Sequence, residues 1–326
     1  MEKLIYSLIL ILGGLSGGYL LQQAVGRGWL TLPLEISRLR VLLQKIGLLF
    51  FMPLSFLGAV WVVSFADVRV VLLPVIGVTV LLSGGVLGML TAKLMRLPGH
   101  QVGVMYCCGS FTNIGAIGGL VCYLFLGEVG FALVALYKMF EEMSYYLIGF
   151  PIARYYGSGE AQEQKMVQRV WRVVGDPFVA TILCAFFIGL LLNLTGVSRP
   201  LFFELVTMVS VPIGTFLLIF SIGLGMRFSK VQDHLGKCVI ISLIKFLAMP
   251  LVGCSFALLV GLHHIGDGTP FKVVMILSSM PVAFNALVAA SLYELDLDLA
   301  NSLWLTTTLS LVVVLPILYF CLQLFP

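Results

Sequence analysis

Two short segments of the chain place glycine, hydroxyl and amide residues in the middle of long apolar runs. They are Gly109-Ser110-Phe111-Thr112-Asn113-Ile114-Gly115-Ala116-Ile117-Gly118-Gly119 and Ser278-Ser279-Met280-Pro281-Val282-Ala283-Phe284-Asn285-Ala286. Such residues interrupt helices, and inside a membrane an interrupted helix survives only where protein covers it or where it lines a cavity. Each segment holds one asparagine, Asn113 or Asn285, whose amide both donates and accepts hydrogen bonds.

These paired interruptions predict a binding site for a small molecule. Its candidate residues are Asn113, Asn285, Thr112, Gly115, Pro281 and Ser110. The alternative is that the small residues only allow close helix packing, as Gly115 and Gly119 could.

Four ionisable residues also fall inside apolar runs: Lys138, Glu141, Glu142 and Lys245. Such residues usually face the interior of a helix bundle and mark the path of an ion or a substrate. Lys138 precedes the two glutamates by three and four residues, so it can pair with either on one helical face. The acid left over is a candidate proton carrier, unless the group is a purely structural pair. Lys245 is a candidate positive charge for an anion, or a lysine that extends toward the membrane interface.

The composition indicates that membrane-spanning helices position these residues. Of the 326 residues, 60% are hydrophobic and only 10% are charged, and the mean hydropathy is +1.09. A soluble domain has about 25% charged residues, so this chain needs lipid as its solvent. The net charge of +4 is spread over several loops, which argues against nucleic-acid binding. No nucleotide-binding or metal-ligand spacing occurs. We therefore expect a multi-pass protein of the cell membrane that is not an enzyme and uses no cofactor or metal.

Ten apolar runs are long enough to cross the membrane, which takes about 20 residues each. They are residues 4–22, 46–65, 70–92, 102–125, 129–153, 177–196, 202–226, 237–261, 271–293 and 300–323. The amphipathic segment 33–45 lies at the interface or extends the second helix outward. The longest polar connection, 154–176, predicts a cytoplasmic linker between two five-helix repeats, 1–153 and 177–326. Because five is odd, the repeats are inverted, and the two interruptions fall in the fourth helix of each.

Basic residues are unevenly distributed between the two sets of loops. One set holds thirteen: Arg27, Arg38, Arg40, Lys45, Lys93, Arg96, Arg154, Lys165, Arg169, Arg172, Arg227, Lys230 and Lys237. The other set holds Lys3, Arg69, Arg199 and Lys272. Cytoplasmic loops carry the excess of Lys and Arg. The sequence therefore predicts that both termini lie on the extracytoplasmic side.

The second half of the chain carries residues that resemble the auxin efflux carrier family. They are Pro250-Leu251, Met280-Pro281-Val282-Ala283-Phe284-Asn285-Ala286-Leu287-Val288 and Leu292-Tyr293-Glu294-Leu295-Asp296. In the first half, Thr112-Asn113-Ile114-Gly115-Ala116-Ile117-Gly118 is similar to a family motif, and later Pro212 through Gly225 is similar to its seventh helix. Two positions depart from the family pattern, because Leu120 replaces a proline and Glu294 replaces a glycine. The short central loop resembles that of bacterial carriers in the bile/arsenite/riboflavin transporter superfamily.

This resemblance implies a ten-helix permease of inverted repeats in which helices 4 and 9 cross at their broken centres. Helices 1, 2, 6 and 7 would form a scaffold, and helices 3–5 and 8–10 a transport domain. Asn113 and Asn285 would match the family's crossover asparagines beside the substrate. The family's substrates are small organic anions, including auxin and dicarboxylates, and its members often form homodimers through the scaffold.

From these observations we expect a secondary carrier for a small organic anion that works by elevator-like alternating access. Proton or sodium coupling is open at this point. One alternative is a sodium symporter of the bile-acid transporter type, which would need a cage of carbonyl, hydroxyl and carboxylate oxygens. Another is a membrane receptor that uses the same fold without transporting.

Overall fold

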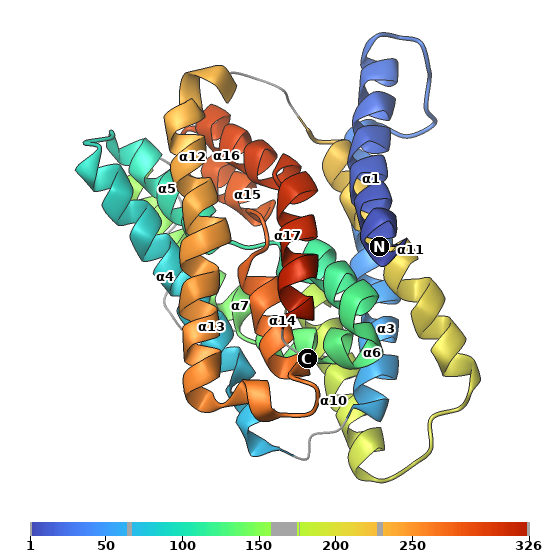
Figure 1. The fold of residues 1–326 in the computed structure, drawn as a ribbon. Coiled ribbons are helices and arrows are strands. Elements are labelled where there is room, and N and C mark those ends of the chain that lie inside the picture. Colours follow the sequence, from blue (N-terminus) through green and yellow to red (C-terminus); the bar gives the residue numbers. More distant parts are fainter. Residues whose placement is uncertain (1, 64–66, 158–174, 176, 227–230, 325–326) are drawn as a thin grey trace. The chain divides into compact units, whose positions relative to one another are not determined.

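The computed structural model describes residues 2–63, 67–157, 175, 177–226 and 231–324 (Figure 1). This part of the chain is helical, and its only extended pairing is a single bridge between Thr112 and Val282. The predicted linker 154–176 lies outside the described residues, except for 154–157 and 175. Five of the basic residues used to predict the orientation also lie outside them: Lys165, Arg169, Arg172, Arg227 and Lys230.

The contacts of the chain define two compact units. The first comprises Met1–Phe65, Gly115–Ala135 and Asp176–Arg227, and the second comprises Ala66–Ile114, Leu136–Gly175 and Phe228–Pro326. Each unit therefore collects segments that are far apart in the sequence.

The first unit is built from helices that are apolar except for the amphipathic α2 (Ile36–Ile46). They are α1 (Glu2–Gly26), α2, α3 (Met52–Val62), α10 (Pro177–Leu194), α11 (Phe202–Gly223) and most of α6 (Gly119–Tyr137). Helix α11 packs against α1 and α3, and α10 packs against α3. The contact of α1 with α11 needs glycine, because a Cβ atom at Gly18 would collide with the backbone of Phe220. Small residues at such contacts let helix backbones approach closely in lipid.

Two polar side chains of this unit, Arg199 and Asn193, are paired within it. The Arg199 guanidinium lies 2.9 Å from the Glu128 carboxylate and donates to the backbone oxygen of Gly58. The Asn193 amide donates to the carbonyls of Trp61 and Val63, at 2.7 and 2.8 Å. Asn193 thereby satisfies carbonyls that the end of α3 leaves without intrahelical partners.

The second unit contains residues 109–114 of the first interrupted segment, the whole of the second segment, and the helices that surround them. Its elements are η2 (Val68–Leu72), α4 (Leu73–Leu94), α5 (Gly99–Ser110), α7 (Glu141–Ser144), η4 (Tyr145–Gly149), α8 (Phe150–Tyr156), η5 (Val231–His234), α12 (Leu235–Leu243), η6 (Ile244–Ala248), α13 (Met249–Val260), η7 (Leu262–His264), α14 (Thr269–Ser278), α15 (Asn285–Leu292), α16 (Leu297–Leu309) and α17 (Leu311–Gln323). Helix α5 packs against α4, α8 and α16, while α13 packs against α4 and α14. The turn η3 (Ile114–Gly118) connects α5 to α6 after the first interruption.

At the start of α4 a charged pair holds the chain to the end of α13. The Arg69 guanidinium bonds to the Asp67 carboxylate and donates to the backbone oxygen of Gly261 at 3.2 Å. This hydrogen-bonded guanidinium lowers the pKa of Asp67 to about 2.

Three of the wide π turns share one cause in the sequence. Each ends immediately before a residue that is followed by proline: η1 (Gly47–Phe51) before Met52-Pro53, η4 before Phe150-Pro151, and η6 before Met249-Pro250. Proline has no N–H, and its ring collides with the carbonyl four residues earlier. The helix accommodates the ring by widening for one turn, and such turns are frequent at functional sites. Two of them, η4 and η6, carry Tyr145 and Lys245.

The segment 33–45 was predicted to lie at the interface or to extend the second helix. The second alternative is correct from Ile36 onward, because α2, η1 and α3 form one helical span over Ile36–Val62. The sequence did not predict a break in the fifth helix. There the chain turns between Tyr137, where α6 ends, and Glu141, where α7 begins.

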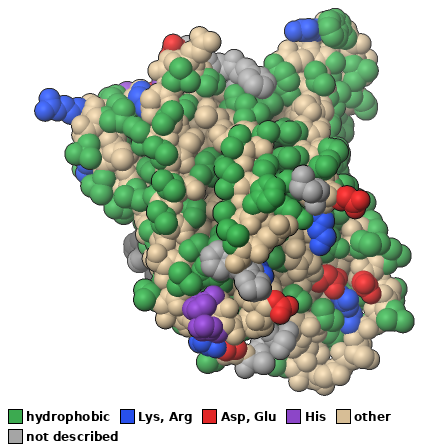
Figure 2. Space-filling view, viewed as in Figure 1, with side chains coloured by type: hydrophobic (Ala, Val, Ile, Leu, Met, Phe, Trp, Pro, Cys, Tyr) green, Lys and Arg blue, Asp and Glu red, His purple; other side chains and the backbone are tan. Residues whose placement is uncertain are grey.

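Hydrophobic side chains are spread over the whole face drawn in Figure 2, where charged side chains are few. Among the described residues, seven helices are long and apolar enough to cross a membrane, or eight if the bent pair α16 and α17 is one span. The count is below ten partly because α5, α14 and α15 are each too short. One of the seven, Ile114–Tyr156, would be about 65 Å long as a single helix, roughly twice the hydrocarbon thickness. The non-helical Gly127, with φ 74°, already divides it. The ten-helix inverted repeat stays a prediction.

Candidate functional site

Both predicted interruptions are present, and in each the helix breaks within the second unit, although residues 115–119 of the first segment belong to the first unit. Helix α5 ends at Ser110, and Phe111 then adopts an extended conformation with ψ 122°. Helix α14 ends at Ser278, and helical structure resumes only with α15 at Asn285. Pro281 favours an extended residue before it and cannot donate a helical hydrogen bond, which explains why α14 does not continue.

The two interrupted segments cross and pair with each other. Thr112 and Val282 form an antiparallel bridge between them. Two hydrogen bonds flank the bridge, from Asn113 N–H to Pro281 O at 2.9 Å and from Ala283 N–H to Phe111 O at 3.0 Å. This pairing satisfies backbone groups that two broken helices would otherwise leave open in lipid.

A buried lysine reaches the crossing from the turn η6. The Nζ atom of Lys245 donates to Thr112 Oγ1 at 2.7 Å, to Phe111 O at 3.0 Å and to Ser110 O at 3.4 Å. Its side chain is 0% exposed, which excludes the alternative of a lysine extending to the interface. The ammonium therefore holds the carbonyl end of α5, where the helix dipole is negative.

A second charged group reaches the same segment through a tyrosine. The Tyr145 hydroxyl accepts the N–H of Thr112 at 3.0 Å and lies 2.9 Å from Glu141 Oε1, to which it donates. The other oxygen of Glu141 is 3.3 Å from the Nζ of Lys138. Tyr145 also packs against the Phe111 ring, with centroids 4.1 Å apart. The sequence left open which acid pairs with Lys138, and the structure pairs it with Glu141.

The second interruption is held by a neutral hydroxyl. Thr307 on α16 accepts the N–H of Val282 at 3.3 Å and donates to Leu303 O at 2.9 Å. Val282 thus has a hydroxyl acceptor for its N–H, just as Thr112 has one in Tyr145.

The structure brings together most of the residues singled out in the sequence. Ser110, Thr112, Asn113, Pro281 and Lys245 meet at the crossing, and Glu141 and Lys138 connect to it through Tyr145. Asn285 lies at the start of α15 and is partly exposed, whereas Asn113 is buried. Gly115 lies in η3, two residues beyond Asn113, and Glu142 is partly exposed on α7. Sequence reasoning missed Tyr145 and Thr307. The signal for Tyr145 was its spacing of four residues from Glu141, which places both on one helical face.

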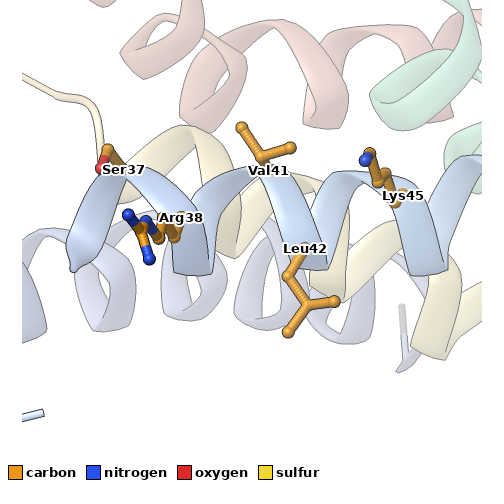
Figure 3. A pocket seen from close by; sticks show the side chains of 5 residues that line it. All are labelled: Ser37, Arg38, Val41, Leu42 and Lys45. Atoms are coloured by element: carbon orange, nitrogen blue, oxygen red, sulfur yellow. The ribbon is translucent and has the colours of Figure 1, made fainter. Parts of the chain in front are cut away.

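A hollow elsewhere on the surface lies along α2 (Figure 3). It is lined by Ser37, Arg38, Val41, Leu42 and Lys45, all of which are exposed. Because these side chains come from one helix and do not converge on a point, the hollow lacks the enclosed polar arrangement of a small-molecule site. The crossing remains the better candidate.

A family model described as "Membrane transport protein" matches residues 40–319. The chain belongs to this family. The match confirms the resemblance to the auxin efflux carriers that the residues around Asn285 indicated. The chain is also 26% identical over 246 residues to an uncharacterized transporter of Methanocaldococcus jannaschii, covering 74% of this chain and 76% of the relative. An uncharacterized transporter of Methanothermobacter thermautotrophicus is 25% identical with the same coverage. As a member of the membrane transport protein family, this protein is a multi-pass membrane transporter.

Proposed function

We propose that the protein is a secondary active carrier for a small organic anion such as a carboxylate, bound where the two interrupted helices cross. The observation that carries the proposal is the fully buried Lys245 at this crossing. A positive charge attracts an anion most strongly where water is scarce, because the effective dielectric constant is low there.

The helix ends at the crossing add to this attraction. Helix α15 begins at Asn285 without a side-chain cap at its N-cap residue Phe284. N–H groups at a helix start carry partial positive charge and favour anions. The amides of Asn113 and Asn285 would orient the carboxylate by hydrogen bonds.

We further propose that transport follows elevator-type alternating access. Spans 1, 2, 6 and 7 would form the scaffold, which also supports a homodimer, and spans 3–5 and 8–10 would carry the substrate. The crossing, Lys245 and Glu141 all belong to one of the two contact units, which supports the idea that the site moves as one body. The repeats 1–153 and 177–326 would be inverted, with both termini extracytoplasmic.

A thermal-shift screen of the purified protein tests the substrate class. Small mono- and dicarboxylates should raise the unfolding temperature in a concentration-dependent way, because a ligand that binds only the folded state stabilises it. Amines and neutral amides of matched size serve as controls. A shift produced by the amines and by no carboxylate would overturn the proposed substrate class.

The orientation has its own test. A cysteine introduced near Pro326 should react with a membrane-impermeant maleimide on intact cells. Reaction only after the cells are permeabilised would place the C-terminus inside and reverse the predicted topology.

A further inference from the structure

Lys245 contacts the interrupted end of α5 in the way that a coordinated cation would. Its Nζ atom has three oxygen neighbours, Thr112 Oγ1 at 2.7 Å, Phe111 O at 3.0 Å and Ser110 O at 3.4 Å. Two of them are backbone carbonyls at the negative end of a half-helix. Unwound carbonyls and half-helix C-termini are the groups that coordinate Na⁺ in transporters with broken helices.

These oxygen dipoles surround the charge of Lys245, which has no direct ionic partner among the described residues. Within the described part of the chain, no carboxylate oxygen lies within the 4.0 Å of an ion pair with Nζ. The Glu141 carboxylate reaches the same segment through the Tyr145 hydroxyl, which accepts the N–H of Thr112. Burying an ammonium without compensation is costly, so the three oxygens must stabilise it locally.

We propose that the Lys245 ammonium is a built-in cation, filling a monovalent-cation site formed by Ser110 O, Phe111 O and Thr112 Oγ1. The turn η6 before Met249-Pro250 carries the lysine to this place, and its side chain occupies the site permanently. A consequence is that the carrier needs no sodium at the crossing. This consequence rests on the proposed function. The cation site itself does not depend on that function, and the test below requires no substrate.

The test is to empty the site and offer a free cation. Lys245→Ala leaves the three oxygens and removes both the charge and the volume of the side chain. Purified wild-type protein and variants are unfolded thermally in sodium, potassium or choline chloride at equal ionic strength. The wild type should unfold at one temperature in all three salts. Lys245→Ala should unfold several degrees higher in sodium or potassium than in choline, rising with the concentration of the cation.

Two further variants make the result specific. Lys245→Met fills the space with an uncharged chain and should show no salt preference. Adding Thr112→Val to Lys245→Ala removes one ligand oxygen and should abolish the preference. A Lys245→Ala protein that responds equally to all three salts overturns the proposal.

The wild-type protein gives a readout that does not depend on the folding of Lys245→Ala. If sodium stabilises the wild type over choline, and Thr112→Val removes that difference, then free sodium already uses these oxygens beside the lysine. That result would also overturn the proposal. Equal unfolding temperatures of the wild type in all three salts support it. A thermal shift produced by amines and by no carboxylate would overturn the proposed function and leave the cation site standing.

Discussion

The two interruptions meet in one crossing, but different chemistry holds each of them. At the first, the Tyr145 hydroxyl accepts the N–H of Thr112 and donates to Glu141, which pairs with Lys138. Lys245 donates to the carbonyls that precede Thr112. At the second, the N–H of Val282 is taken by Thr307, whose hydroxyl bonds to its own helix. One break is therefore held by charged groups and the other by a neutral hydroxyl.

This difference divides the tasks that a carrier site must perform. A buried charge responds to protons and anions, while a neutral hydroxyl only fixes the backbone. Substrate charge and any coupling should therefore depend on the first interruption. The second should act mainly as a rigid partner that supplies Asn285 and the start of α15.

The largest effect is expected from removing the buried charge. Lys245→Met should weaken anion binding by about 100-fold, because a charge roughly 5 Å away at an effective dielectric constant of about 20 contributes about 3 kcal/mol. Lys237→Met is the matched control in the same span, since Lys237 donates to Gln101 and lies away from the crossing. Binding affinities of the two variants, measured by calorimetry, decide the matter. Equal affinities would mean that the charge of Lys245 does not act on the substrate.

The asparagines test whether both interruptions contribute to one site. Asn113→Ala and Asn285→Ala should each weaken binding by about five- to 150-fold, since losing one buried hydrogen bond costs roughly 1–3 kcal/mol. Their thermal stability should change little. Asn193→Ala, which uncaps α3 in the first unit, should instead lower stability and leave binding intact. If only Asn113→Ala weakens binding, the site belongs to the first interruption alone.

The interruptions themselves were predictable because glycine, proline and asparagine act locally. Pro281 ends a helix wherever it occurs in a buried run, and no tertiary information is needed to expect this. The position of Lys245 was less predictable. Without the π turn before Pro250, Lys245 would point to a different side of its helix. The side on which a residue lies can be predicted from sequence only where the helix has regular turns.

The break in the fifth helix could not be read from composition. Residues 138–140 contain neither glycine nor proline. The chain turns there because Glu141 N–H bonds to Lys138 O at 2.8 Å and the two side chains pair across the turn. Tyr145 was missed for a related reason. Its contact with Thr112 joins residues 33 positions apart, which no local pattern reports.

Removing either of the two hydroxyls, on Tyr145 or Thr307, should have a smaller effect, and the two variants should differ in stability. Tyr145→Phe and Thr307→Val each leave one buried N–H without its acceptor, which costs about 1–3 kcal/mol. Tyr145→Phe should be the more destabilising, because the Tyr145–Thr112 hydrogen bond is shorter than the Thr307–Val282 bond. This variant also loses the hydrogen bond from Tyr145 to Glu141. Thermal unfolding measures this difference. Only Tyr145→Phe should also alter transport, and an equal loss of transport in Thr307→Val would contradict the division between charged and neutral interruptions.

The smallest change in affinity is expected from the acids, although it bears most directly on coupling. Glu141→Gln keeps an acceptor for Tyr145 but removes the charge facing Lys138. Folding stability should fall by about 3–5 kcal/mol, because the largely buried Lys138 side chain loses its partner, whereas substrate affinity should change little. If Glu141 carries the coupled proton, this variant should lose the pH dependence of transport in proteoliposomes, because glutamine does not titrate. Glu142, one residue further on α7, is the acid that the Lys138–Glu141 pair leaves over and thus the second candidate carrier, so Glu142→Gln is measured beside it. A reversed outcome would make Glu142 the proton carrier. If the double variant also keeps the wild-type profile, the ion pair is structural, and the charged interruption serves the substrate through Lys245 alone.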